Sequence, residues 1–386
     1  MAIAMGIDPG TKSFDLVVIE DDRVIWEKSI ETIDIAKNPF KLIDVIEEAG
    51  RVDLIAGPSG YGVPVTCNED IIDPWRFALE VLLLTREEDL KEGIARGEIG
   101  IAVYEAIAKV VVELWRKKLP VCYIPSVILL PTVPYHRKIN KLDMGTADKL
   151  AIAVLAVYDQ SKRLSIEYSD TSFILVELGF GYNAVIAVED GLIVDGLGGT
   201  ISSTGFLTIG PIDAELAVMG RLWSRSDVFH GGIAEICNTF DISKVIEGYK
   251  RGEEPYESAL EAMIEGVVKA VYSIRYSVRK PREVILSGRY TRIRDIVGMI
   301  RERLEDIAPV VKLKGLENAR IAKEAAQGYA VIAEGLAGGF FRDLISYMRI
   351  RDASGTVMNY VFHPRLIEAK KKLLDTYAET VKNPML

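Results

Sequence analysis

Residues 3–28 read IAMGIDPGTKSFDLVVIEDDRVIWEK, and residues 172–197 read SFILVELGFGYNAVIAVEDGLIVDGL. Aligned without a gap, the two stretches keep a constant offset of 169 residues, so that Asp8 falls on Glu177 and the glycine two positions later also keeps its place. Each copy has the pattern of a buried strand, a tight acid-and-glycine turn, a second strand, an acidic reverse turn and a third strand. Two hairpins can look alike by chance, but here the acid, the glycine and the second turn all stay in register.

This internal repeat predicts an α/β protein with two similar domains that face each other across a cleft. Short apolar runs and amphipathic stretches alternate along the rest of the chain. Strands are expected at residues 52–56, 123–132, 283–286 and 310–313. Helices are expected at residues 41–50, 74–95, 100–118, 147–159, 213–219, 233–249, 256–278, 291–306 and 319–335, with loops at 135–141 and 196–210. The amphipathic tail, 340–386, is expected to pack on a domain or on a partner. A homodimer is therefore one of the alternatives.

The composition is that of a globular protein. A length of 386 residues corresponds to two or three domains, and 49% hydrophobic with 27% charged residues excludes a disordered chain. The 47 Lys and Arg stand against 56 Asp and Glu, and the resulting net charge of −9 offers no positive field to duplex nucleic acid or an anionic membrane. We therefore expect a small-molecule substrate, and neither nucleic acid nor a membrane as a partner.

Other sequence features favour a cytoplasmic location. No run approaches 18 uninterrupted apolar residues, so no membrane-spanning helix is expected. The first eight residues lack the basic flank of a signal peptide. Cys67, Cys122 and Cys237 are widely spaced and odd in number, so they fit neither a disulfide framework nor a CxxC metal site. A reducing compartment follows from this cysteine pattern.

The first turn, Asp8-Pro9-Gly10-Thr11-Lys12-Ser13, has the residue types of a phosphate site. Its backbone N–H groups and two hydroxyls would form a concavity for the terminal phosphates of a nucleotide. Its aspartate would supply a hard oxygen for magnesium, usually through water. An exposed β-turn of ordinary turn residues is the alternative, and the GxxxxGK[ST] spacing of a P-loop is absent.

The second turn, Glu177-Leu178-Gly179-Phe180-Gly181-Tyr182-Asn183, repeats this device in the second half. Across a cleft, Asp8 and Glu177 would place two carboxylates around one hydrated cation. A buried ion pair of Glu177 is the alternative, because an unpaired buried carboxylate is costly.

Three further segments fit a nucleotide cleft. A strand ends at Ser287-Gly288-Arg289, a small turn that an adenine ring could approach closely. Two helices rich in Ala and Gly, at 146–153 and 323–330, could cross at short distance, as a hinge between domains requires. Ordinary close packing explains either helix equally well.

In this order, the two phosphate turns, the adenosine turn and the two small-residue helices resemble the acetate and sugar kinase/Hsp70/actin (ASKHA) superfamily over roughly residues 1–340. Within it, the chain with its HRKINKLDMGTADKL segment is similar to a family known as predicted butyrate kinase. The resemblance implies the actin-like ATPase fold, with ribonuclease-H-like domains at 1–160 and 170–322 and a crossing helix and helical tail at 323–386.

The resemblance also implies ATP and Mg²⁺ as cofactors. Asp8 and Glu177 would hold the metal, and Asp8 would in addition be catalytic. The nucleotide would be bound by Gly10, Thr11, Lys12, Gly179, Gly181, Gly288 and Arg289. The chain departs from the superfamily at two points, because its second turn begins with Glu rather than Asp and its adenosine turn has one glycine rather than two.

The nature of the acceptor determines which further residues are needed. A hydroxyl acceptor requires a general base, for which Asp148 is the candidate, although helix capping explains this residue as well. A carboxylic acid is already ionised at pH 7 and requires only cations around the transferring phosphoryl group. His136 and Arg137, in a basic loop that is otherwise a solvated turn, are the candidates for that role. The loop after the second repeat, with Gly199 and Thr200, would border the acceptor or the γ-phosphate, or serve as a flexible connection.

The leading interpretation is an ATP-dependent phosphotransferase that acts on a small carboxylic acid, with Mg-ATP bound between the domains. A kinase of a hydroxyl substrate and an ATPase conformational switch of the actin or Hsp70 kind remain alternatives. A metal-dependent tRNA-modifying member is rejected because no HxxxH pair occurs, and an iron–sulfur activator because the cysteines are not clustered.

Overall fold

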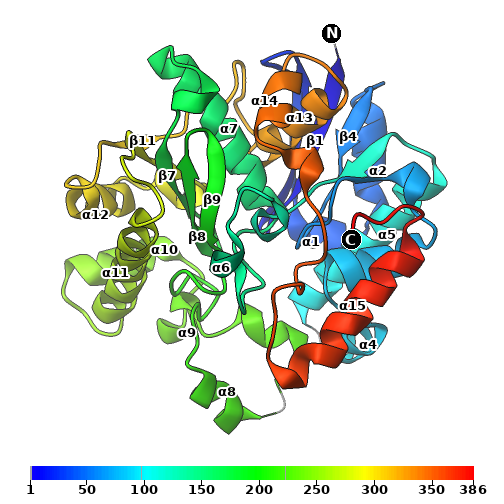
Figure 1. Cartoon of the computed structure of the whole chain (residues 1–386). Helices are drawn as coiled ribbons and strands as arrows, with labels where there is room; N and C mark the ends of the chain where they lie inside the picture. The colour runs from blue at the N-terminus through cyan, green and yellow to red at the C-terminus, as the bar shows by residue number, and fades with distance from the viewer. Residues whose placement is uncertain (1, 97, 222) are drawn as a thin grey trace.

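Each of the two repeats forms one side of a β-sheet in the computed structural model, which describes residues 2–96, 98–221 and 223–386 (Figure 1). Each repeat makes three antiparallel strands joined by tight turns, and its first two strands are apolar runs that are buried on both faces. The first set comprises β1 (Ile3–Pro9), β2 (Ser13–Glu20) and β3 (Arg23–Glu31). The second comprises β7 (Phe173–Leu178), β8 (Asn183–Glu189) and β9 (Leu192–Leu197).

Parallel strands extend both sheets in the same way. The first sheet has the order β3-β2-β1-β4-β6-β5, in which β4 (Leu54–Ala56) and β6 (Val121–Tyr123) run parallel to β1 and β5 (Thr66–Cys67) is an antiparallel edge. The second has the order β11-β10-β7-β8-β9, in which β10 (Glu283–Ser287) and β11 (Val310–Lys312) run parallel to β7. The predicted fold class, two duplicated ribonuclease-H-like domains, is therefore confirmed.

The duplication extends to backbone details. The pairing of β2 with β3 shifts between Val18 and Ile19, and the pairing of β8 with β9 shifts 169 residues later, between Ala187 and Val188. The reverse turns that follow both contain an aspartate with positive φ, 52° at Asp21 and 51° at its counterpart in the second repeat. A short polar side chain tolerates this left-handed conformation better than most residues do.

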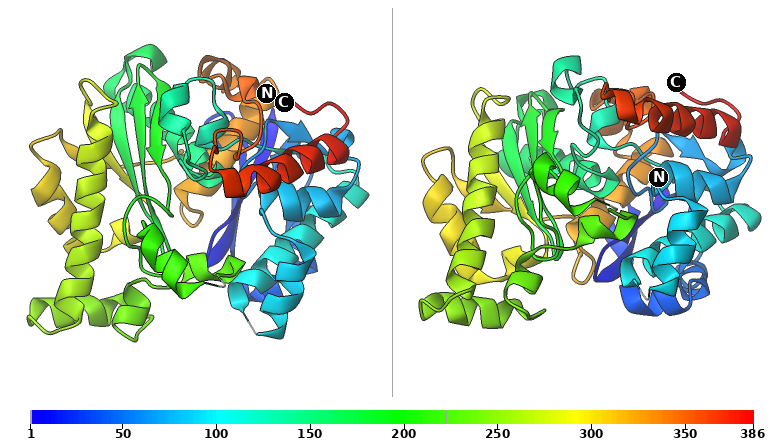
Figure 2. Two further views of the ribbon diagram at one scale, coloured as in Figure 1. Left: turned by 60° about the horizontal axis from the view of Figure 1, so that its bottom comes forward. Right: turned by 90° about the horizontal axis from the view of Figure 1, so that it is seen from below.

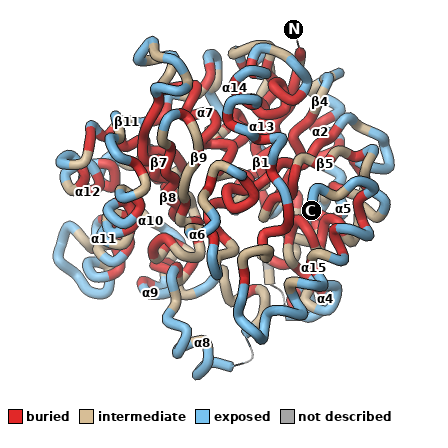
Figure 3. The backbone as a smooth tube through the Cα atoms, viewed as in Figure 1, coloured by how far each residue is buried: buried red, intermediate tan, exposed pale blue. Residues whose placement is uncertain are grey.

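Two helices lie between the sheets and carry much of the core. They are α7 (Ala147–Leu164) and α13 (Glu324–Leu336), and both are largely buried in Figure 3. α13 packs on β1 so closely that a Cβ on Gly6 would lie 2.2 Å from the Ala326 carbonyl oxygen. One hydrophobic cluster joins the first sheet, both helices and one face of the second sheet, and another fills the opposite face of the second sheet.

The other helices cover the outer faces of the sheets (Figures 1 and 2). In the first half they are α1 (Thr32–Lys37), α2 (Phe40–Glu48) and α5 (Ile99–Arg116). In the second half they are α9 (Ile233–Ile236), α10 (Ile242–Lys250), α11 (Tyr256–Arg275) and α12 (Arg294–Leu304), whereas α8 (Ala214–Gly220) has no buried residue and lies away from the sheet. None of the helices in the described ranges is both long and apolar enough to span a bilayer.

The tail folds back on the first domain. After α14 (Arg342–Tyr347), α15 (Ile367–Thr380) packs its buried face on the segment around Phe77–Leu82. The amphipathic pattern of this helix is thus accounted for within the chain.

Several predicted elements are shorter than expected. The helix expected at 74–95 is divided into α3 (Pro74–Arg76), a π-helical segment (Phe77–Leu82) and α4 (Glu87–Ala95). Leu84, between the π-helical segment and α4, has a positive φ of 49°. The strand expected at 123–132 ends at Tyr123, since prolines in this stretch cannot donate to a β-ladder. The helix expected at 233–249 is interrupted between α9 and α10, and the loop expected at 135–141 begins with a short helix, α6 (Tyr135–Lys138).

The expectation that the cysteines form no disulfide is wrong. Cys67 on β5 and Cys122 on β6 are directly opposite each other in the antiparallel pairing, and their sulfur atoms are bonded. Cys237 is free and buried. The spacing along the chain did not indicate this bond, because β5 and β6 are brought together by the sheet across 55 residues.

Candidate functional site

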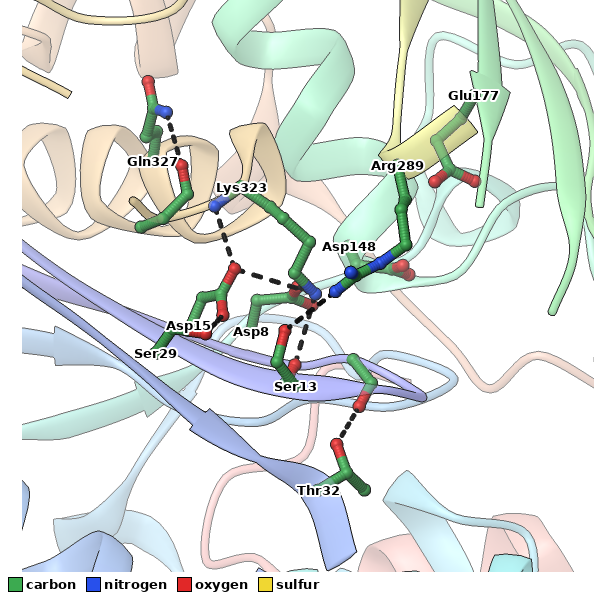
Figure 4. Close-up of polar contacts among 12 residues, drawn as sticks. Asp8, Ser13, Asp15, Ser29, Thr32, Asp148, Glu177, Arg289, Lys323 and Gln327 are labelled. Carbon is green, nitrogen blue, oxygen red and sulfur yellow. Dashed lines mark hydrogen bonds and ion pairs between the residues drawn. The ribbon is translucent and has the colours of Figure 1, made fainter. Parts of the chain in front are cut away.

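A cavity of about 740 Å³ lies where the hairpin turns of both repeats meet the first turns of α7 and α13. Figure 4 shows Asp8 at the end of β1, Asp148 at the start of α7 and Glu177 on β7 directed toward the same space. All but two of the residues predicted from sequence line this cavity, namely Asp8, Gly10, Thr11, Lys12, Asp148, Glu177, Gly179, Gly181, Gly199, Thr200, Gly288 and Arg289. The two acids of the repeat therefore share one cavity.

The two exceptions are His136 and Arg137 on α6. The imidazole of His136 is exposed and does not line the cavity. The Arg137 side chain points to β9, where Nη1 donates to the Val194 carbonyl oxygen at 2.8 Å and Nε lies 3.8 Å from Asp195. Their expected role at the phosphoryl group is not supported, because the contacts of Arg137 anchor α6 to the second sheet.

Asp8 is paired with Lys323, which precedes α13. Lys323 Nζ lies 2.8 Å from Asp8 Oδ2 and 3.2 Å from the Ser13 carbonyl oxygen, so it fills the hollow of the first turn. A Cβ on Gly10 would lie 2.2 Å from this ammonium nitrogen. The backbone N–H of Lys323 also donates to Asp15 Oδ2 at 2.9 Å, which fixes the start of α13 against β2.

Glu177 is paired with Lys149 in the first turn of α7. Lys149 Nζ lies 3.2 Å from Glu177 Oε2 and 2.5 Å from Asp148 Oδ2. Thr146 Oγ1 donates to the other oxygen of Asp148 at 2.5 Å, so this carboxylate is held from two sides. The buried ion pair that the sequence left open for Glu177 is thus present, and it lies inside the cavity.

Burial and these pairings shift the pKa values of the acids. Burial raises the pKa of Glu177 to about 7, although Lys149 opposes the shift. Burial also raises the pKa of Asp8 against the opposing charge of Lys323. At Asp148 burial is outweighed by the charge and hydrogen bond of Lys149, and the pKa is lowered. Perturbed carboxyl groups gathered in one cavity are typical of functional sites.

Glycines allow a close approach of protein atoms within the second hairpin turn and at the turn around Gly288. A Cβ on Gly179 would lie 2.6 Å from the Tyr182 carbonyl oxygen. Gly288 has a φ of 94°, and a Cβ there would lie 2.5 Å from the Leu178 carbonyl oxygen and 2.7 Å from Glu177 Oε1. The turn at Gly288 is therefore in contact with the hairpin turn of the second repeat. The next residue, Arg289, extends its side chain toward the hairpin turn of the first repeat, where Nη2 lies 3.4 Å from Ser13 Oγ.

Asp143 is a cavity residue for which the sequence analysis assigned no role. Its buried carboxylate accepts hydrogen bonds from the backbone N–H and the hydroxyl of Thr200, each at 3.1 Å, and from the N–H of Gly145. These bonds tie the loop before α7 to the loop after β9. Burial raises the pKa of Asp143.

Lys149 and Lys323 were also missed. A lysine at the start of a helix opposes the helix dipole, which favours acids at that end. Both lysines occupy such positions at the start of largely apolar helices, and this anomaly is the signal in the sequence that could have identified them.

Another part of the cavity wall is apolar and aromatic. It is formed by side chains of both halves, Tyr61, Leu83, Val103, Tyr104, Ile107 and Phe229. Figure 2 shows α8 and the segment after it extending from the second sheet toward α5 beneath the gap. This segment brings Phe229 within stacking distance of Tyr104, with ring centroids 5.7 Å apart.

Arg225, on the same segment, is a cation that lacks an acidic partner among the described residues. Its Nη2 donates to the hydroxyls of Tyr61 at 2.6 Å and Tyr104 at 3.3 Å. Its Nε is buried and has no hydrogen-bond partner within the described part of the chain. Arg225 does not itself line the cavity, but Tyr61 and Tyr104 do, so its permanent charge lies directly behind this part of the wall.

The donor set fits a hydrated magnesium ion that arrives with phosphates. Within the described ranges, no three His, Cys, Asp or Glu side chains are grouped closely enough to hold a metal by themselves. Magnesium keeps several waters and is commonly bound through one or two carboxylates plus substrate phosphates. Asp8 and Glu177 are the carboxylates that could contribute, next to hairpin turns whose glycines line the same cavity.

Comparison with solved structures gives the same fold. A propionate kinase from Francisella tularensis subsp. tularensis SCHU S4 superposes with a TM-score of 0.56, at 14% identity over 86% of this chain and 98% of the other. An acetate kinase from Porphyromonas gingivalis superposes with a TM-score of 0.54, at 12% identity over 90% of this chain and 100% of the other. An acetate kinase from Entamoeba histolytica superposes with a TM-score of 0.53, at 12% identity over 79% of this chain and 87% of the other. The chain therefore shares the actin-like ATPase fold with these kinases.

No curated protein matches the sequence significantly. A family model does match it, over residues 6–363, and its description is "protein of unknown function (DUF1464)". Because this match covers most of the chain, the protein belongs to the DUF1464 family.

Proposed function

We propose that the protein is an ATP-dependent phosphotransferase whose acceptor is a small carboxylic acid with an apolar body. The observation that carries the proposal is the mixed lining of one cavity. Its polar part has two hairpin turns with carboxylates and lysines, and its apolar part includes Tyr61 and Tyr104, whose hydroxyls accept from Arg225. The fold shared with acetate and propionate kinases is compatible with this activity.

The polar part supplies what phosphoryl transfer requires. Asp8 and Glu177 would hold magnesium through its water shell, and the metal when bound would neutralise charge on the phosphates. Gly10 and Gly179 line the cavity at the two turns, and without side chains they would let phosphate oxygens approach the backbone. Lys12 and Arg289, which line the cavity, add positive charge where two anions have to meet.

The reaction needs no general base. An oxygen of the acceptor carboxylate attacks the γ-phosphorus of ATP, the bond from that phosphorus to the β–γ bridging oxygen breaks, and an acyl phosphate and ADP result. A carboxylic acid is ionised at pH 7, so no proton has to be removed. Asp148 is poorly suited to act as a base, because it is ion-paired with Lys149 and its pKa is lowered.

The apolar part favours a carboxylic acid over a sugar. The hydroxyls of Tyr61 and Tyr104 already accept from Arg225, and that of Tyr182 donates to the Val228 carbonyl oxygen. A sugar placed against this wall would leave several hydroxyls without partners, and each buried unsatisfied group costs about 1–3 kcal/mol. A hydrocarbon or aromatic group loses nothing there, and its carboxylate would be attracted by the charge of Arg225 behind the wall.

Trapping of the product with hydroxylamine tests the proposal. The purified protein is incubated with Mg-ATP and a series of linear acids from acetate to octanoate, with benzoate and phenylacetate alongside, and acyl hydroxamate is measured together with ADP. We expect hydroxamate to form, with the highest kcat/KM among acids larger than acetate. ADP formation with sugars but with none of the acids would replace the proposal by a hydroxyl kinase. Slow ADP formation at a rate that does not change with any acid or sugar would replace the proposal by an ATPase switch.

A further inference from the structure

The two acid–lysine pairs of the cavity are exchanged between the halves of the molecule. Asp8 belongs to the first repeat, and its partner Lys323 begins the crossing helix that follows the second repeat. Glu177 belongs to the second repeat, and its partner Lys149 begins the crossing helix that follows the first. Each metal-ligand candidate is therefore neutralised by an ammonium group from the other half (Figure 4 shows the first pair).

The position of Lys323 is incompatible with a metal ion on the same oxygen. Its Nζ lies 2.8 Å from Asp8 Oδ2 and 3.2 Å from the Ser13 carbonyl oxygen, inside the turn that would receive phosphate. A cation bound to that oxygen through water would need this space and would repel the ammonium group. Asp15, whose Oδ2 lies 3.8 Å from Lys323 Nζ, is a second carboxylate beside this ammonium group.

We infer that Lys323 is an internal counter-ion that occupies the cation position at Asp8 in the nucleotide-free protein and has to move off Asp8 when Mg-nucleotide binds. The inference rests on the proposed function only in taking this turn as the phosphate turn. The long, flexible stem of a lysine allows its ammonium group to swing from the carboxylate to a phosphate oxygen nearby. Lys149 stands in the same relation to Glu177.

The arrangement has a physical advantage for a nucleotide-binding cleft. Without a cation, Asp8, Asp15 and Glu177 would be three buried carboxylates in one region, and an unpaired buried charge is strongly destabilising. Two lysines compensate these charges in the empty state. Because each lysine comes from the opposite half, its release also removes an ion pair that holds the two halves together.

The test measures whether the protein responds to magnesium without nucleotide. In wild type, Lys323 competes for Asp8, and we expect 10 mM Mg²⁺ alone to leave the Tm unchanged. In Lys323→Met the ammonium group is absent, and we expect a lower starting Tm that Mg²⁺ alone raises by about 2 °C or more. Lys162→Met is the matched control, since Lys162 also pairs with acids, 2.7 Å from Asp22 and 3.3 Å from Glu317, but does not line the cavity.

An equal response of wild type and Lys323→Met to Mg²⁺, or a response of Lys162→Met as large as that of Lys323→Met, overturns the inference. If Lys323→Met does not fold, Lys323→Arg is tested in its place. The planar guanidinium of arginine is larger than the ammonium group and cannot occupy the turn in the same way. We therefore expect Lys323→Arg to weaken ADP binding in the absence of Mg²⁺ by about tenfold. Unchanged ADP binding in that variant overturns the inference as well. The two proposals can fail separately. If no hydroxamate forms but Mg²⁺ raises the Tm of Lys323→Met alone, the proposed reaction is overturned and this inference stands.

Discussion

Gly328 of α13 lies directly on the backbone of Ala151 in α7, so closely that a Cβ at Gly328 would stand 2.1 Å from the Ala151 carbonyl oxygen. The two helices that close the two halves of the chain cross at this point. Both of their first turns contribute a lysine to the cavity, and the contact therefore fixes how Lys149 and Lys323 are placed relative to each other.

Adding one methyl group at this crossing should destabilise the protein. Gly328→Ala forces the helices apart against rigid backbone, and we expect a loss of about 2 kcal/mol or more in the free energy of unfolding. Gly298→Ala is the matched control, because Gly298 also lies in a helix, α12, but a Cβ there meets nothing within 4 Å. Helix propensity predicts that this control gains about 0.5–1 kcal/mol. Urea unfolding of both variants separates the two cases, and equal values would contradict the close crossing.

The crossing shows what the sequence can reveal about the fold. The ungapped repeat predicted the duplicated strands, and small residues in two helices predicted a close contact between them. The partner of each small residue was not predictable, because Gly328 and Ala151 are brought together by tertiary packing across most of the chain.

Asp8→Asn should abolish most of the turnover while leaving the fold intact. The amide keeps the shape of the side chain but removes the charge that would hold magnesium, and we expect kcat to fall by about 100-fold or more. The hydroxamate assay measures kcat, and circular dichroism checks the fold. Asp34→Asn is the control, since Asp34 is exposed and pairs with Lys41 outside the cavity. Near-normal turnover in Asp8→Asn would remove Asp8 from the mechanism.

Glu177 should make the nucleotide-free protein less stable as the pH rises. Its pKa is about 7 in the folded protein and about 4.5 when unfolded, so between these values only the folded state retains the proton. The stability that Glu177 contributes is then full below pH 4.5 and is lost as the pH rises through 7. Relative to Glu177→Gln, wild type should lose up to about 3 kcal/mol between pH 4.5 and 8.

The control for this pH dependence is Glu283→Gln. Glu283 is paired with Arg163, and although burial raises its pKa, the hydrogen bonds from Arg163 and Gln160 lower it overall. Its contribution is present at neutral pH and is lost only as the pH falls through its depressed pKa. The stability difference from wild type should therefore vary with pH in the opposite sense. The same sense in both variants would contradict the assignment at Glu177.

Thiol counting tests the disulfide that the sequence reading excluded. With Cys67 and Cys122 bonded, denaturation without reductant should expose one reactive thiol, that of Cys237, and denaturation after reduction should expose three. Mass spectrometry after alkylation measures both numbers. Three thiols before reduction would mean that the two cysteines are adjacent but reduced.

The errors of the site prediction share one physical cause. The cationic density around His136 and Arg137 was visible in the sequence, but the direction of the side chains was not, and α6 turns Arg137 toward β9. Lys149 and Lys323 lie within the quoted small-residue helices, yet their partners come from the opposite halves of the chain. Motif residues on the repeat were found because the repeat itself places them at the ends of corresponding strands.

Arg225→Met should separate acceptor binding from nucleotide binding. Removal of the guanidinium leaves the acceptor carboxylate without its charged partner, and a charge-assisted hydrogen bond contributes about 1.5–3 kcal/mol, so the KM for the acid should rise about 10- to 100-fold. The KM for ATP should stay unchanged, because within the described part of the chain Arg225 donates to Tyr61 and Tyr104 and not to the residues proposed to bind the nucleotide. Arg221→Met, at an exposed position on the same segment, controls for the loss of charge. A parallel rise in both KM values would mean that Arg225 only supports the tyrosines between the two halves, and the carboxylate would then have to be recognised elsewhere in the cavity.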